Sequence, residues 1–339
     1  MAEALVPASI PLLSPDVTVQ ALPGGDLSVE TADTEYTFHG EGGRALAAVA
    51  DRLDGSASIA DLASPAEVSP ESLAKVLDSL VEDGLVMDAR RLLQPSSVEE
   101  FLAAYHQACG LWAKEMSLGP FWSTLASGRA PRAMVLGWGV EFYHYVEAAN
   151  EHMAASVAYC RGDPGARRWF AQHYAEEYNH SIIFLEGLVA CGLDRDQVRR
   201  APPLSTTRAL LNHLVELATT DSLAYAGAFG LMRDSRAVRD DQRVRYEQLI
   251  EHYPFARGMF EAIQKHNNLD QGLKHDELVL ERIVQRDGRV TPEAARRIAG
   301  GARSTLEHFV LYFEGIHDAY VAPGAVLPRR AVDVRALAR

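Results

Sequence analysis

The chain has 339 residues, of which 47% are hydrophobic and 23% charged, and its formal net charge is −13. This length predicts two domains rather than a single helical core. The negative charge argues against nucleic-acid binding, because phosphate binding needs a basic surface. No apolar run approaches the roughly 20 residues that cross a bilayer, and the N-terminus lacks a basic region. We therefore expect neither a membrane partner nor a signal peptide.

The three cysteines give no sign of a structural or catalytic site. Cys109, Cys160 and Cys191 are scattered, odd in number and form no Cys-x-x-Cys pair. A disulfide framework and a cysteine zinc site are both unexpected, and a reducing cytoplasm suits such a chain. The expected localisation is cytoplasmic.

The first 91 residues predict a small α+β domain. Short alternating segments lie between Asp16 and Phe38, separated by Pro23-Gly24-Gly25 and by the region of Asp33, which is typical of a β-meander. Helical patterns follow at 43–53 and 58–63, and Ser69-Pro70 opens a helix that ends at Gly84. The segment 85–88 (LVMD) reads as a last strand, the wing. The pattern predicts a winged-helix domain over 1–91.

The remainder predicts a helical bundle over residues 98–322, after a linker at 92–99. Almost no strand pattern is found there, and turn residues such as Gly162-Asp163-Pro164 separate the helical segments. The expected helices cover 98–116, 119–126, 131–160, 164–191, 205–233, 241–253, 255–284 and 291–320. No fixed repeat is visible, so the pattern favours a mainly α bundle over a repeat array. The basic tail beyond it is expected to be peripheral.

Candidate metal ligands recur along these helices. A Glu-x-x-His unit places both side chains on one helix face, which suits a metal site built from facing helices. One helix carries Glu141 and His144, and the next carries His173, Glu177 and His180. A later helix carries His266 and Asp270. Carboxylates in such apolar text need partners, and this donor set suits iron or manganese.

On these residues, the region from 98 to 320 resembles the heme-oxygenase-like superfamily, which includes diiron oxidases, quinone-cofactor-forming oxidases and thiaminase-II-like proteins. The resemblance implies a heme-oxygenase-like bundle with iron, as Fe²⁺ and in the diiron case dinuclear, and O₂ as co-substrate. The implied ligands are Glu141, Glu177, His180, Asp221, His266 and Asp270, with Asp234 as the alternative to Asp221. Leucine stands at 273, where the family pattern has a histidine, and His275 would need a helix distortion to replace it. An incomplete site, or a pocket that has lost its metal, is therefore open.

The front domain is similar to winged-helix leader-recognition modules of ribosomal-peptide modification systems. The matching positions are the turn Leu53-Asp54-Gly55 and the sequence Gly84-Leu85-Val86. Such a module would add a peptide as an extra strand at a sheet edge. Residues 1–91 hold 16 acidic against 5 basic residues, which disfavours the DNA binding common among winged helices. A dimerisation or packing module is the alternative, and a homodimer is compatible with it.

These features predict a non-heme iron, O₂-dependent oxidase or oxygenase that tailors a peptide or an amino-acid-derived natural product, with a peptide or a carrier-bound amino acid as the expected substrate. His144 and Tyr178 are the expected catalytic side chains beside the metal. One alternative is a metal-free enzyme of the same fold that uses pocket histidines and tyrosines for acid–base chemistry. Another is a non-catalytic peptide-binding scaffold for a partner enzyme. Heme oxygenase activity itself is disfavoured, because only His106 lies where a proximal histidine would be expected.

Overall fold

The computed structural model divides into two compact units, Met1–Pro95 and Ser96–Arg339. It describes residues 4–14, 17–22, 26–31, 34–233, 239–272 and 279–331. For residues 82, 232–233, 239–245 and 267–272 only the backbone is described.

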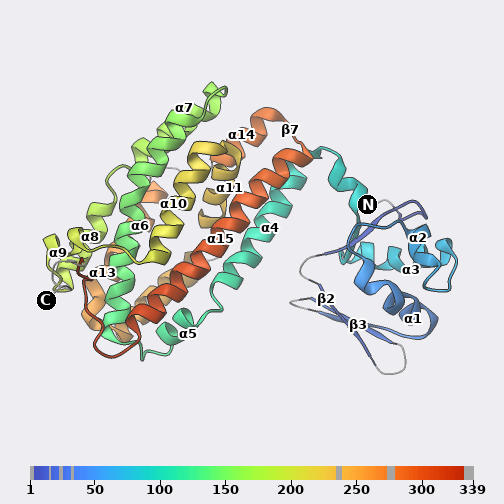
Figure 1. Ribbon diagram of the computed structural model, residues 1–339, viewed down its shortest axis with the longest axis horizontal. Helices are drawn as coiled ribbons and strands as arrows, with labels where there is room; N and C mark the ends of the chain where they lie inside the picture. Colours follow the sequence, from blue (N-terminus) through green and yellow to red (C-terminus); the bar gives the residue numbers. More distant parts are fainter. Residues whose placement is uncertain are drawn as a thin grey trace, which may run out of the picture. The chain divides into compact units, whose positions relative to one another are not determined.

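The front unit is a small α+β structure (Figure 1). Its strands β2 (Thr18–Ala21), β3 (Leu27–Glu30) and β4 (Glu35–Phe38) form an antiparallel sheet in the order β2-β3-β4, which confirms the predicted meander. The expected wing strand, β5 (Val86–Asp88), pairs with β1 (Pro11–Leu13). The sequence did not predict β1, because proline and leucines there show no alternation.

Three helices cover the core of the front unit. They are α1 (Gly40–Val49), α2 (Ile59–Ala63) and α3 (Pro70–Glu82). Local capping explains two of their starts: Ser58 forms a capping box with Asp61, and the Ser69 side chain accepts from the Ser72 amide. Their apolar faces meet in a core that includes the fully buried Leu46, Leu73 and Leu77.

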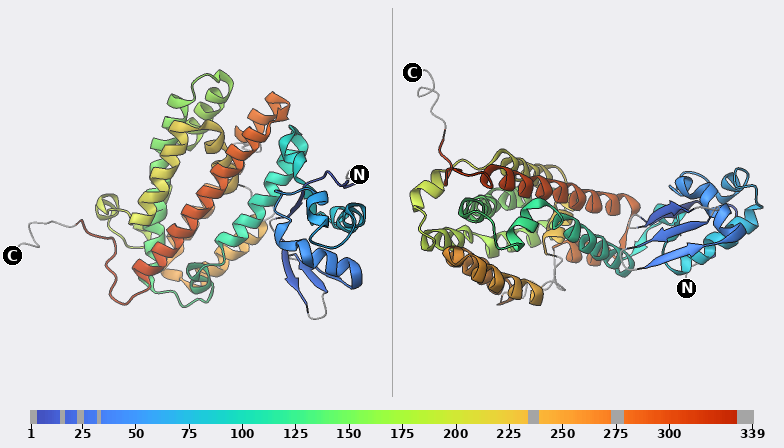
Figure 2. Two further views of the ribbon diagram at one scale, coloured as in Figure 1. Left: turned by 45° about the vertical axis from the view of Figure 1, so that its right-hand side comes forward. Right: turned by 90° about the horizontal axis from the view of Figure 1, so that it is seen from below.

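The second unit is a helical bundle with one short strand pair (Figure 1, Figure 2). Ser97 and Glu100 form the capping box that begins α4 (Val98–Met116). The long helix α15 (Pro292–Tyr320), drawn in red, runs along the bundle. It contacts α4, α6 (Arg132–Tyr159), α10 (Ser205–Thr220) and α11 (Ser222–Arg233). Strands β6 (Ser96–Ser97) and β7 (Arg289–Val290) pair where α4 and α15 begin. The helices are α4 (Val98–Met116), α5 (Pro120–Ala126), α6 (Arg132–Tyr159), α7 (Pro164–Glu177), α8 (Ser181–Ala190), α9 (Arg195–Arg200), α10 (Ser205–Thr220), α11 (Ser222–Arg233), α12 (Arg239–His252), α13 (Arg257–Gly272), α14 (Val279–Asp287) and α15 (Pro292–Tyr320).

One helix expected over 205–233 is two helices, and Asp221 explains the break. Its carboxylate accepts from the amides of Leu223 (3.0 Å) and Ala224 (3.1 Å), which are free donors in the first turn of α11. The same carboxylate pairs with the Arg297 guanidinium through bonds of 2.8 and 2.7 Å. Asp221 thus begins α11 and ties it to α15.

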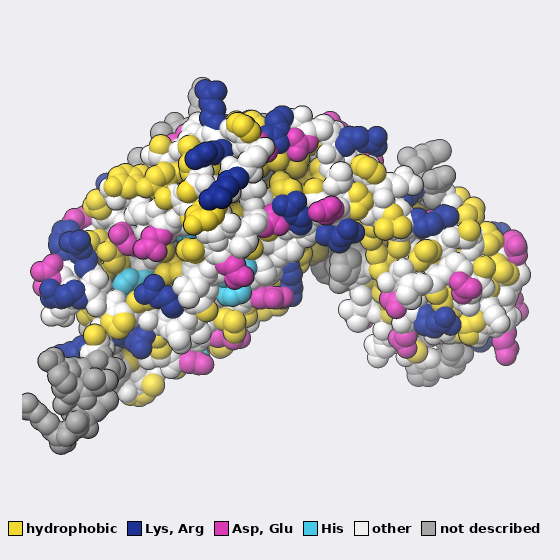
Figure 3. Space-filling view, turned by 45° about the horizontal axis from the view of Figure 1, so that its top comes forward, with side chains coloured by type: hydrophobic (Ala, Val, Ile, Leu, Met, Phe, Trp, Pro, Cys, Tyr) yellow, Lys and Arg dark blue, Asp and Glu magenta, His cyan; other side chains and the backbone are white. Residues whose placement is uncertain are grey.

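Two apolar cores fill the bundle. One surrounds Phe121, Trp138 and Phe260, and the other surrounds Tyr225 and Ile298. On the face in Figure 3, basic side chains are scattered among acidic ones rather than gathered in one patch. Within the described part of the chain, no helix combines the length and the apolar character needed to cross a membrane.

Candidate metal centre

Glu177, His180 and His266 meet in the bundle. One ligand atom from each lies within 4.8 Å of the others, and all three side chains are mostly buried. His180 Nδ1 lies 2.9 Å from Glu177 Oε2 and 3.2 Å from His266 Nε2. His266 Nε2 lies 3.5 Å from the same carboxylate oxygen. Two imidazoles and one carboxylate therefore converge on one point; we refer to these three residues as the Glu177 cluster.

The Glu177 cluster depends on a break in a helix that the sequence predicted to be continuous over 164–191. Helix α7 ends at Glu177, and His180 is the N-cap of α8. Between them Asn179 takes the left-handed φ of 64°. Asparagine tolerates this conformation better than other residues with a side chain, apart from aspartate and histidine. The break turns Glu177 and His180 toward each other independently of helical spacing.

Helix α6 holds both sides of this break. The Asn179 amide donates to Asn150 Oδ1 at 3.2 Å, and the Ser181 hydroxyl donates to Glu147. The two acceptors lie three residues apart on α6, so they share one helix face. The short segment that carries two of the three ligands is thereby fastened to a long helix.

His266 reaches the Glu177 cluster because α8 and α13 pack closely against each other. A Cβ on Gly187 would lie 2.7 Å from the Gly258 carbonyl oxygen, and a Cβ on Gly258 would lie 2.8 Å from the Gly187 carbonyl oxygen. Any larger residue at either position would push the helices apart. These two glycines set the distance across which His180 and His266 meet.

The electrostatics favour a negative carboxylate at the Glu177 cluster. Burial alone would raise the pKa of Glu177, but the hydrogen bond from His266 and the charges of His266, His173 and His180 lower that pKa to about 2. His173 Nε2 lies 3.9 Å from Glu177 Oε1, on α7 one turn before it. Glu177 is therefore ionised at neutral pH, the form that a metal ligand needs.

This donor set fits iron. Two histidines and one carboxylate with open positions are the set that non-heme Fe(II) oxygenases use. Imidazole nitrogen and carboxylate oxygen also disfavour a metal that needs sulfur ligands. Among the described side chains, this is the only group of three or more histidines, cysteines and acidic residues that could share one ion.

The structure places Glu141 away from the Glu177 cluster, although the sequence predicted it as a ligand. Glu141 is fully buried. Its Oε2 accepts from the Leu204 amide and its Oε1 from the Tyr320 hydroxyl, both at 3.0 Å. Burial raises the pKa of this carboxyl, despite these hydrogen bonds. Glu141 links α6 to the start of α10 and to the end of α15, and both of its oxygens are occupied.

Of the other predicted ligands, Asp221 has partners elsewhere and the side chain of Asp270 is not among those described. Asp221 is engaged by Arg297 and by α11, so it is not a member of the Glu177 cluster. The side chain of Asp270 and all of Asp234, Leu273 and His275 lie outside the described residues.

The two predicted catalytic side chains, His144 and Tyr178, differ in burial. Burial and the charge of Arg208, on α10, lower the pKa of His144 to about 4. Its buried Nε2 has no hydrogen-bond partner among the described residues. Tyr178 lies in the break beside Glu177, and 54% of it is exposed. Tyr178 therefore neighbours the Glu177 cluster, whereas His144 is a buried, neutral side chain that is not a member of it.

Sequence reasoning missed the supports of the site. Glu147 and Asn150 stand three residues apart in the apolar sequence of α6, and this pair of polar residues was an available signal. The sequence contained no signal for the left-handed conformation of Asn179, because the Glu-x-x-His pattern around it fits a continuous helix equally well. The sequence grouped His173 with Glu177 and His180 as candidate ligands on one helix. In the structure, His173 does lie next to Glu177.

The family model described as "Iron-containing redox enzyme" matches residues 136–309, just over half of the chain. The match runs from α6 into α15 and includes every residue of the Glu177 cluster. The chain belongs to this family. Membership confirms the predicted heme-oxygenase-like relationship and the redox class, and it supports iron as the metal. No curated protein matches the chain.

Solved structures agree with the fold of this family of iron-containing redox enzymes. A heme-oxygenase-like domain of unknown function from Shewanella denitrificans is 17% identical, with a TM-score of 0.52, and the match covers 68% of this chain and 98% of that one. A CADD-like protein of unknown function from Nostoc punctiforme is 13% identical, with a TM-score of 0.50, over 66% of this chain and 99% of that one. At these identities the likeness shows the fold alone. The predicted mainly α, heme-oxygenase-like class is confirmed.

The left-handed conformation of Asn179 leads to a prediction about stability and iron binding. Asn179→Val should lower the free energy of unfolding by about 1–2 kcal/mol, because a β-branched side chain is strained at positive φ. It should also weaken iron binding, since Glu177 and His180 flank this position. Asn179→Gly keeps both the φ and the amide that bonds to Asn150, so it is the matched control. Thermal unfolding measures the stability of both variants, and titration with iron measures their affinity. Equal stability and equal iron affinity in the two variants would contradict the prediction.

Proposed function

We propose that this protein is a non-heme iron oxidase or oxygenase that uses O₂ and acts on a peptide or an amino-acid-derived natural product. The observation that carries the proposal is the convergence of Glu177, His180 and His266 within 4.8 Å in a chain of the iron-containing redox enzyme family. These described side chains suffice for one iron ion. A second ion would need further donors, and Asp270, one turn after His266, is the candidate in sequence.

Bound iron would supply the O₂ reactivity and one-electron chemistry that side chains alone lack. The protein's part is to hold the ligands and shape their surroundings. Ionised Glu177 would offer negative charge to the ion, and His173, whose Nε2 lies 3.9 Å from Glu177 Oε1, would help to orient that carboxylate. Asn150 and Glu147 hold the loop that presents them. Tyr178 and Ile182, each about half exposed, offer apolar surface for a substrate beside the ligands.

The front unit is proposed to hold the peptide. In the sheet order β2-β3-β4, the outer sides of β2 and β4 are edges, and in the described residues neither pairs there with another strand. A peptide could add to either edge through backbone hydrogen bonds. The acidic excess of residues 1–91 favours a peptide with basic side chains.

Selection of a displayed random peptide library on the full chain tests this part. We expect enrichment of basic sequences that protect the amides of β2 or β4 from hydrogen exchange. Peptides that protect only bundle amides, or no enrichment at all, would contradict it.

Oxygen consumption tests the proposed chemistry. The full chain, loaded anaerobically with Fe(II) and given ascorbate as reductant, should consume O₂ faster than the same solution with Glu177→Gln protein. His308→Ala is a matched control, because His308 is a partly buried histidine of α15 that stacks on His213 outside the Glu177 cluster. Oxygen uptake that is equal in wild type and Glu177→Gln would refute the proposal.

A further inference from the structure

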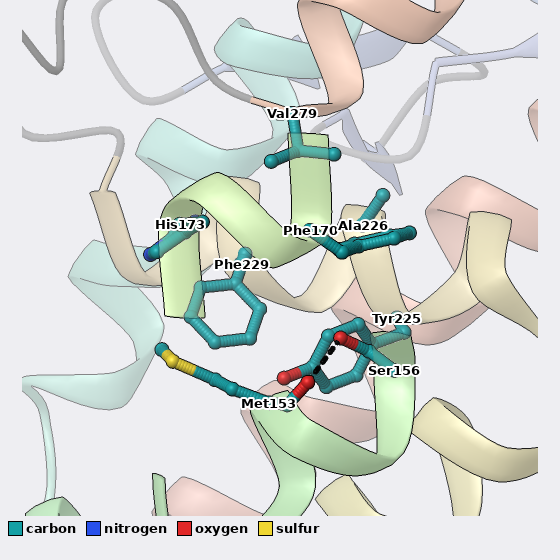
Figure 4. A pocket seen from close by; sticks show the side chains of 8 residues that line it. All are labelled: Met153, Ser156, Phe170, His173, Tyr225, Ala226, Phe229 and Val279. Atoms are coloured by element: carbon teal, nitrogen blue, oxygen red, sulfur yellow. Dashed lines mark hydrogen bonds between the residues drawn. The ribbon is translucent and has the colours of Figure 1, made fainter. Parts of the chain in front are cut away.

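A small pocket lies between α6, α7, α11 and α14 (Figure 4). Its walls are mainly apolar: Met153, Phe170, Ala226, Phe229 and Val279 line it. The space left between these side chains takes about one molecule of the size of water. The pocket is thus too small for a peptide side chain, and only a very small guest fits it.

The two hydroxyl groups in its wall both have hydrogen-bond partners. The Ser156 hydroxyl donates to the Met153 carbonyl at 2.7 Å, drawn as the dashed line in Figure 4. The Tyr225 hydroxyl lies 2.7 Å from His152 Nδ1. Burial lowers the pKa of His152 to about 3 and raises that of Tyr225 well above its usual value. His152 is therefore neutral and Tyr225 keeps its proton, and the hydrogen bond between them leaves this pair satisfied without a guest.

A water molecule needs about two to four polar partners to remain in a cavity. Because Ser156 and Tyr225 already bond to protein groups and five of the eight lining residues are apolar, the pocket offers a water few polar partners. A small apolar molecule loses nothing there, since it forms no hydrogen bonds in solution. The chemistry of the wall selects for an apolar guest over water.

His173 connects the pocket to the Glu177 cluster. Its side chain lines the pocket, and its ring centroid lies 5.1 Å from that of Phe229. Its Nε2 lies 3.9 Å from Glu177 Oε1. A guest in the pocket is therefore separated from the carboxylate ligand by a single side chain.

We propose that this pocket is a binding site for dioxygen, from which the gas reaches the Glu177 cluster past His173. The inference rests on the proposed O₂-dependent function, which gives a reason to store a small apolar gas at this place. Met153 is suited to the wall because its unbranched side chain adapts to a guest of variable shape.

Xenon is the probe, because it occupies dry apolar cavities in proteins. Crystals of the iron-free full chain, pressurised with xenon, should show an anomalous peak between Met153 and Phe229. Ala226→Val adds two methyl groups to the wall and should abolish that peak. Ala228→Val is the matched control, because Ala228 is a fully buried residue of the same helix that does not line the pocket. Val279→Ile is a second filling variant if Ala226→Val fails to fold.

The outcomes separate the pocket from the chemistry. In iron-loaded protein the filling variants should raise the KM for O₂ at unchanged iron content, whereas Ala228→Val should not. An ordered water in the pocket, or xenon bound only elsewhere, would overturn the proposal and leave the iron site standing. Xenon in the pocket of a protein that consumes no O₂ would support a gas site and refute the proposed oxidase.

Discussion

His180→Ala should reduce the affinity of the protein for Fe(II) by more than about 100-fold. Loss of a residue that merely orients a ligand already costs about 10- to 100-fold in metal affinity, and loss of a ligand costs more. His180 contacts both Glu177 and His266, so its removal leaves two donors from two different helices. Two donors hold a divalent ion far less tightly than three.

Competition with a fluorescent Fe(II) chelator under anaerobic conditions measures this affinity. His308→Ala, in the stacked His213–His308 pair, should bind iron like wild type. Glu177→Gln should resemble His180→Ala, because an amide supplies no negative charge to the ion. Wild-type affinity in both cluster variants would mean that the iron lies elsewhere, or that the chain acts without metal.

Glu141→Ala should lower the free energy of unfolding by about 3 kcal/mol or more and leave the iron content unchanged. Without the carboxylate, the buried Leu204 amide and the Tyr320 hydroxyl each lose their acceptor, at about 1–3 kcal/mol per unsatisfied group. Chemical denaturation measures the loss. Iron loss at retained stability would instead make Glu141 a ligand.

The pH dependence of stability provides a second measure of Glu141. Its pKa is raised in the folded protein, so the folded state holds this proton more tightly than the unfolded state does. The resulting stabilisation is complete below the ordinary pKa of 4.5 and is lost as the pH rises through the raised value. Glu141→Gln removes that dependence. A variant whose stability falls toward neutral pH as steeply as that of wild type would contradict the assignment.

Much of the fold could be predicted from the sequence because local signals were strong. Ser69-Pro70 begins α3 as its capping pattern predicts, and the alternation between Asp16 and Phe38 is the meander of β2, β3 and β4. The break at Asp221 had a local signal, because an aspartate that caps the first amides of α11 is a common helix start. The break at Asn179 had no such signal, and it is held by a contact with Asn150 on a distant helix.

Part of the candidate site could also be predicted from the sequence. Glu177, His180 and His266 were recognisable by residue type, and the structure brings them together through the close approach at Gly187 and Gly258. Glu141 and Asp221 have the same residue types in similarly apolar text, but their oxygens are occupied by backbone amides and by Tyr320 or Arg297. Spacing along a helix does not reveal which carboxylates already have partners.

Anomalous diffraction at the iron edge tests the central claim most directly. Crystals of the full chain, loaded anaerobically with Fe(II), should show their strongest iron peak between Glu177, His180 and His266. A peak at any other place, or no peak after loading, would contradict the account.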